Sequence, residues 1–262
     1  LKRYSHSQTV QIKVLHGKMA TATVKASSAG GDGRRKADPN MGENNAVKAY
    51  LVAYNVSQML GWLVLMIKII HHMAAEQDTE TLYAEVEPIL KIFQTAAVME
   101  IVHSAIGLVK SNPVLTGFQV FSRVFLLWGV VWSVPEVQTT PYILCFLVAW
   151  TITEIIRYSF YFFSLLGQVP YFLKWCRYTF FIILYPIGVT GEVMTIYLAL
   201  PHVLESDMYS VSLPNAANIS FSYYYYLCFI IFSYLPVFPQ LYGHMLAQRK
   251  KIISSPQRPK KE

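Results

Sequence analysis

Long apolar stretches separated by short polar segments dominate the sequence. The hydrocarbon core of a bilayer is about 30 Å thick, so roughly 20 apolar residues in a helix are enough to cross it. Each stretch reaches that length and therefore predicts a membrane-spanning helix. The six predicted spans cover about residues 50–70, 89–109, 114–134, 142–166, 178–200 and 221–243. The pattern predicts an all-α polytopic membrane protein.

Three segments of different composition follow from this pattern. Residues 1–45 are rich in Gly, Ser, Asn and charge, which predicts a disordered basic tail. Residues 46–248 form the predicted six-helix membrane domain, and residues 249–262 form a second basic tail. Within the tails, Met19 is the expected natural start, with residues 1–18 upstream of it. The pair Lys260 and Lys261 is similar to a dilysine retrieval signal of the endoplasmic reticulum, displaced by one position.

Composition supports the membrane class and excludes others. Charged residues make up 14% of the chain, against about 25% in a soluble domain. Of the 22 Lys and Arg, nine lie in residues 1–48 and six in residues 249–262. A nucleic-acid-binding domain would spread its basic residues over the fold, so the basic tails are expected to face anionic lipid head groups instead. Cys145, Cys176 and Cys228 have no metal-ligand spacing, so no metal site is expected.

The loops predict the orientation in the membrane. Cytosolic loops carry an excess of Lys and Arg, and loops 71–88, 135–141 and 201–220 contain none. The basic residues at the opposite ends of the spans are Lys48, Lys110, Lys174 and Arg177. Both termini are therefore predicted to be cytosolic, which requires an even number of spans.

Ionisable residues inside the predicted spans are candidates for function, because burial of charge in lipid is costly. They are Glu100, His103, Arg123, Glu154, Arg157 and Glu192. Their depths predict one central polar cavity that is open to the cytosol. These residues can instead have a purely structural role, in which they neutralise or hydrogen-bond one another. Glu154 and Arg157 are i,i+3 neighbours, Arg123 can pair with Glu100, and His103 can hydrogen-bond Glu100.

The fifth span carries the most informative stretch, Leu184 to Glu192. Tyr185 and Glu192 are seven residues apart, two helical turns, so they share one face. Pro186 removes a backbone hydrogen bond and can kink the helix. Gly188 and Gly191 leave little bulk between the two polar groups. The stretch predicts either a substrate slot with a phenol and a carboxyl at its ends or a groove for helix packing.

Four segments of the predicted membrane domain form an ordered set: Trp150–Tyr161, Lys174–Tyr178, Tyr185–Glu192 and Phe238–Tyr242. Together they resemble a known family, the very-long-chain 3-hydroxyacyl-CoA dehydratases, also called protein-tyrosine-phosphatase-like. The resemblance covers about residues 46–250. The resemblance implies a six-span protein of the endoplasmic reticulum membrane that removes water from 3-hydroxyacyl-CoA to give trans-2-enoyl-CoA, the third step of fatty-acid elongation. It also implies that Tyr185 and Glu192 are catalytic and that no cofactor is needed.

The resemblance also implies partners, and the residues themselves suggest further roles. The elongase, the 3-ketoacyl-CoA reductase and the enoyl-CoA reductase are the expected partners. Glu192 is favoured as the base and Tyr185 as the proton donor, although the sequence does not decide between the two assignments. The candidates for substrate binding are Arg123, Glu154, Arg157, Tyr158, Lys174, Arg177, Gly188 and Gly191. The alternative is a catalytically silent member that acts as a membrane scaffold for the elongation enzymes.

Overall fold

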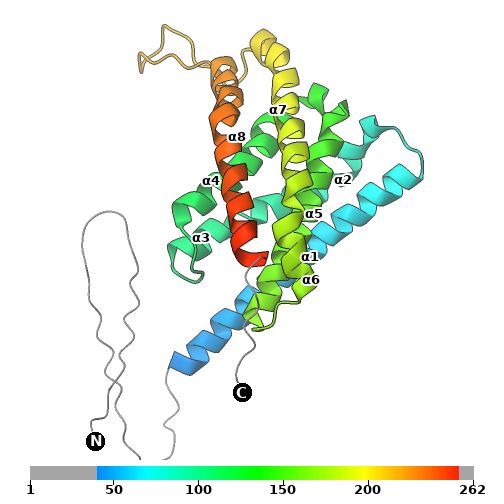
Figure 1. The fold of residues 1–262 in the computed structure, drawn as a ribbon. Coiled ribbons are helices and arrows are strands. Elements are labelled where there is room, and N and C mark those ends of the chain that lie inside the picture. The colour runs from blue at the N-terminus through cyan, green and yellow to red at the C-terminus, as the bar shows by residue number, and fades with distance from the viewer. Residues whose placement is uncertain (1–39, 254–262) are drawn as a thin grey trace, which may run out of the picture. The chain divides into compact units, whose positions relative to one another are not determined.

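The computed structural model describes residues 40–253, and the side chains from residue 45 onward. All named elements in this range are helical (Figure 1). They are α1 (Asn40–Ala74), α2 (Thr79–Ala96), α3 (Met99–Ala105), α4 (Pro113–Phe125), the π-helical η1 (Leu126–Val131), the 3-10 helix η2 (Pro135–Thr139), α5 (Tyr142–Leu165), α6 (Tyr171–Thr179), α7 (Phe181–Ser206) and α8 (Tyr223–Ile253). Met19, Lys260 and Lys261 lie outside the described residues.

Helices α1 and α8 both reach into segments that were predicted to be tails. Helix α1 already begins at Asn40, inside the segment 1–45 that was predicted to be disordered. Helix α8 continues to Ile253, inside the predicted tail 249–262. Lys250 and Lys251 form part of the last turn of α8, where positive charge interacts favourably with the negative end of the helix dipole. Lys250 and Lys251 therefore lie at a favourable position for positive charge.

Five helices in the described part of the chain are long and apolar enough to cross a membrane. These spans are Asn45–Ala74, Pro113–Val131, Tyr142–Leu165, Phe181–Ser206 and Tyr223–Ile253. They coincide with five of the six predicted spans. The remaining one, about 89–109, falls on α2 and α3, which are separated by a break at Ala97 and Val98. Helix α2 carries several charged residues, namely Glu80, Glu85, Glu87 and Lys91.

Helix α5 is the central element of the packing. It contacts α1 and α7, and α8 packs in turn against α7, with which it runs side by side in Figure 1. The largest fully buried side chains include Trp62 of α1 and Trp150 and Phe146 of α5. Helix α5 is therefore packed directly against α7, the helix that carries Glu192. Side chains of α5 are buried in the bundle along most of the helix.

Side chains at the helix ends fix where α2 and α4 begin. Asp78 caps α2 by accepting a hydrogen bond from the backbone N–H of Glu80 at 3.2 Å. Asn112 caps α4, accepting from Val114 N at 2.9 Å, as N-cap residues do. The buried His72 of α1 hydrogen-bonds Glu85 of α2 at 2.9 Å, and this bond lowers the pKa of the Glu85 carboxyl. These contacts hold the α1–α2 connection together.

Candidate functional site

The Glu192 carboxylate is held by two other helices. Its Oε1 accepts a hydrogen bond from Trp150 Nε1 of α5 at 2.7 Å, and its Oε2 accepts one from the Tyr234 hydroxyl of α8 at 2.8 Å. Both donors are neutral, so within the described residues no basic side chain is hydrogen-bonded to this carboxylate. An acidic group with neutral donors inside a membrane helix is a candidate for proton transfer.

Tyr185 lies on the same side of α7, against α8. Its ring is nearly parallel to that of Phe238, with centroids 5.1 Å apart, and to that of Tyr242, at 6.2 Å. Tyr242 is itself fixed, because its hydroxyl donates to Ile182 O at 3.2 Å. The Tyr185 hydroxyl makes no hydrogen bond within the described part of the chain, and its oxygen remains available to a bound molecule. Helix α7 continues through Pro186 as an α-helix.

A network of four charged side chains lies beside this pair. Arg157 donates from Nε to Glu154 at 2.8 Å and from Nη2 to Glu100 at 2.8 Å. Arg123 forms an ion pair with the other oxygen of Glu154, and the Tyr158 hydroxyl donates to Glu100. Two guanidinium groups thus neutralise two carboxylates inside the bundle, as burial requires.

This network confirms one structural expectation and corrects two. The predicted pair of Glu154 and Arg157 forms. The predicted pair of Arg123 with Glu100 is wrong, because Arg157 reaches Glu100 and leaves Arg123 to Glu154. The predicted hydrogen bond of His103 to Glu100 is also wrong. His103 Nε2 instead lies 2.8 Å from the hydroxyl of Tyr50 on α1.

Trp150 connects the charged network to Glu192. The Arg123 guanidinium lies over the Trp150 ring, 5.3 Å from its centroid, a cation–π arrangement. The sequence analysis missed Trp150 and Tyr234 as neighbours of Glu192. Local spacing marks each of these residues but does not show that it meets Glu192. Trp150 is one helical turn before Glu154, and Tyr234 begins an i, i+4, i+8 aromatic stripe that continues through Phe238 and Tyr242.

Gly188 and Gly191 face α5. A Cβ atom added at Gly191 would lie 2.7 Å from Phe146 N and 2.9 Å from Tyr142 O, and one at Gly188 would lie 3.2 Å from Ala149 Cβ. The space beside these glycines is therefore filled by α5. Of the two interpretations of this stretch, the helix-packing groove is the one that these contacts support.

We expect Gly191→Ala to destabilise the contact between α5 and α7. The added methyl group would collide with the α5 backbone, and overpacking of this kind costs about 1–3 kcal/mol. Thermal unfolding of the purified protein in detergent measures the effect. Gly117→Ala is the matched control, because a Cβ at Gly117 of α4 meets no atom within 4 Å. Equal melting temperatures of the two variants would contradict the packing role.

Two of the other candidates for substrate binding, Arg157 and Arg177, make contacts with protein side chains. Arg157 donates hydrogen bonds from Nε and both terminal nitrogens to Glu100 and Glu154. It therefore has no pair of unused N–H groups with which to bind a phosphate in a bidentate way. The Arg177 guanidinium of α6 lies over the Phe160 ring at 4.4 Å. Lys174, on the same helix, is half-buried.

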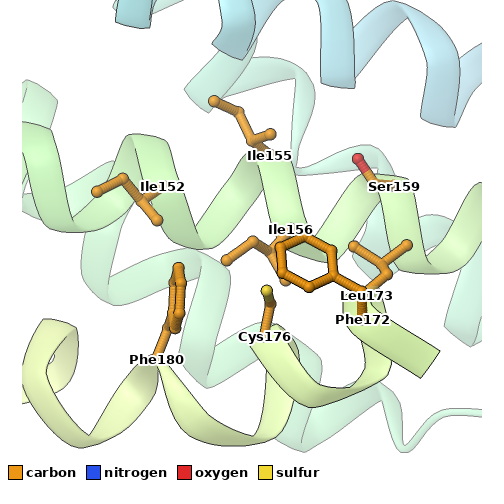
Figure 2. A pocket seen from close by; sticks show the side chains of 8 residues that line it. All are labelled: Ile152, Ile155, Ile156, Ser159, Phe172, Leu173, Cys176 and Phe180. Atoms are coloured by element: carbon orange, nitrogen blue, oxygen red, sulfur yellow. The ribbon is translucent and has the colours of Figure 1, made fainter. Parts of the chain in front are cut away.

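A pocket of 280 Å³ between α5 and α6 lies apart from the candidate site (Figure 2). Its lining is almost entirely apolar and includes Ile152 and Ile156 of α5 and Phe172 of α6. At 3.6 residues per turn, Ile152 and Ile156 point away from the face of α5 that carries Trp150 and Glu154. The pocket therefore takes no part in the contacts around Glu192.

Comparison with known proteins identifies the family. Residues 94–255 match the model of the protein tyrosine phosphatase-like protein family, PTPLA. The chain is 56% identical over 213 residues to very-long-chain (3R)-3-hydroxyacyl-CoA dehydratase 2 of Homo sapiens, which covers 81% of this chain and 84% of the relative. It is 42% identical over 212 residues to the dehydratase PASTICCINO 2 of Arabidopsis thaliana, covering 80% and 96%. The chain belongs to this family. No solved structure matches it.

The family description mentions tyrosine phosphatases, whose nucleophile is a cysteine thiolate. The stretch from His103 to Lys110 contains no cysteine and carries Ser104 instead. Ser104 is buried and donates its hydroxyl to Ile101 O at 2.9 Å. The stretch therefore offers no phosphatase nucleophile.

Proposed function

We propose that this chain dehydrates very-long-chain 3-hydroxyacyl-CoA to trans-2-enoyl-CoA in fatty-acid elongation, with Glu192 and Tyr185 as its catalytic residues. The observation that carries the proposal is the half-buried Glu192, whose carboxylate is held between α5 and α8 by neutral donors, on the same α8-facing side as the Tyr185 phenol. Relatives from a mammal and a plant that carry the dehydratase name support the reaction and the substrate class.

The reaction requires two proton transfers. Glu192, as general base, takes the proton from C2 of the substrate, and the electron pair of that C–H bond forms the C2=C3 double bond. The C3–O bond breaks, and Tyr185 donates its phenolic proton to the leaving hydroxyl, which departs as water. The proton on Glu192 returns to Tyr185 through solvent after release. The two residues are about 10.5 Å apart along α7, so the mechanism requires both side chains to lean toward the same pair of acyl carbons.

The proposed membrane domain has six spans, one more than the five candidate spans in the described residues. The sixth span is the predicted segment of about residues 89–109, on the second half of α2 and on α3, which gives the even number that two cytosolic termini require. The protein lies in the endoplasmic reticulum membrane, and acyl-CoA enters from the cytosol through a central polar cavity. The elongase and the two reductases of the cycle are its partners, since they make its substrate and consume its product. Arg123 and Lys174 remain candidates for contact with the bound substrate.

A direct assay tests the proposed reaction. We expect the full-length protein, purified in detergent, to convert a very-long-chain (3R)-3-hydroxyacyl-CoA to the trans-2-enoyl-CoA, followed by mass spectrometry. The (3S) epimer is the control for stereochemistry. A folded preparation that forms no enoyl product would contradict catalysis and favour the scaffold function.

A further inference from the structure

The two hydrogen bonds on Glu192 come from side chains that have no other hydrogen-bond partner within the described residues. The indole N–H of Trp150 is only a donor, so the direction of its bond to Glu192 is fixed. Trp150 is 2% exposed, and its ring is packed between Phe146, at 4.9 Å, and the Arg123 guanidinium, at 5.3 Å. The donor on α5 therefore has little freedom to move.

Tyr234 provides the second donor from a different helix. It belongs to the α8 stripe of Tyr234, Phe238 and Tyr242, whose last two rings stack on Tyr185. One face of α8 thus contacts both groups of the proposed catalytic pair. With one carboxylate oxygen bound to α5 and the other to α8, rotation of the Glu192 carboxylate is restricted.

Such restriction matters for proton transfer. A general base acts only within hydrogen-bond reach of the proton that it removes, and a displacement of about 1 Å can cost a factor of about 100 in rate. Two donors still leave the base functional, because an ionised carboxylate has about four lone-pair positions. Removal of one donor would let the carboxylate turn away from the substrate.

We propose that Trp150 and Tyr234 are positioning residues that orient the Glu192 carboxylate for proton abstraction. This inference rests on the proposed dehydratase function. Neither residue contacts the reacting carbons; each acts through Glu192. Arg123 supports Trp150 by covering the face of its indole ring while Glu154 holds the guanidinium in place.

The experiment compares two pairs of matched variants. Trp150→Phe and Tyr234→Phe remove the donors and keep aromatic rings. Trp62→Phe and Tyr83→Phe are the controls, because Trp62 and Tyr83 are each 1% exposed and their N–H and O–H groups have no hydrogen-bond partner in the described structure. For each variant, kcat and KM for the 3-hydroxyacyl-CoA and the melting temperature in detergent are measured.

We expect kcat to fall by about 10–100-fold in Trp150→Phe and Tyr234→Phe, with KM within about twofold of wild type. The controls should keep the wild-type kcat per folded molecule. Wild-type kcat in both donor variants, or a loss that only matches a lower folded fraction, overturns the inference. Failure of the dehydratase function itself is recognised separately, because the wild-type protein would then form no enoyl product.

Discussion

Glu192→Gln is expected to lower dehydration by about 10²–10⁴-fold, the range that general acid–base catalysis contributes. Glutamine keeps the shape of the side chain and an oxygen that accepts a hydrogen bond, but it cannot take a proton from C2. Tyr185→Phe should lower the rate by a similar factor, because it removes the phenolic proton and keeps the ring stacked on Phe238. Initial rates of enoyl-CoA formation by the purified variants measure both effects.

Two observations separate this loss from unfolding. The melting temperature of both variants should remain near that of the wild type. Tyr225→Phe is the control for loss of a phenol, because Tyr225 on α8 is 73% exposed and lies outside the proposed pair. Full turnover by either Glu192→Gln or Tyr185→Phe would remove that residue from the mechanism, whatever the similarity to the dehydratase relatives.

The second large effect concerns stability. Arg157→Leu removes the ion-pair partner of Glu100 and leaves Glu154 with Arg123 alone. The Glu154 side chain is only 2% exposed. Removal of one partner of a buried ion pair costs about 3–5 kcal/mol. We therefore expect a large drop in the melting temperature in detergent and a smaller monodisperse fraction on size-exclusion chromatography.

The combined variant with Glu100, Glu154, Arg123 and Arg157 all replaced by Leu provides the comparison. It removes the charges together, and replacement of a complete buried network by apolar residues is often neutral for stability. We expect it to melt at a higher temperature than Arg157→Leu. Lys110→Leu, at an exposed position, is the surface control. An unchanged melting temperature of Arg157→Leu would show that the network does not stabilise the bundle.

Burial of four charges has a consequence for substrate binding. Arg157, a candidate for substrate binding from the sequence, uses its donors on Glu100 and Glu154. Arg123 uses one terminal nitrogen on Glu154, and its side chain is 25% exposed. Of these two guanidinium groups, Arg123 is the one with donors left for a ligand.

The sequence by itself determined the helical membrane class, because about 20 apolar residues in a row are stable only across a bilayer or in a large core. It also determined that Tyr185 and Glu192 lie on one face of α7, because their separation of seven residues is two helical turns. The family resemblance was also visible in the sequence, because it rests on segments of consecutive residues. Span length, residue spacing and sequence segments are all properties of residues that are close together in the chain.

Only the tertiary structure decided which side chains meet across helices. Arg123 was free to pair with Glu100 or Glu154, and the packing of the helices selected Glu154. Trp150 and Tyr234 are each 42 positions away from Glu192 in the chain, so no local pattern brings them together. The physical reason is that helix-to-helix contacts depend on the axial shift and rotation of whole helices, which close packing sets and local spacing does not.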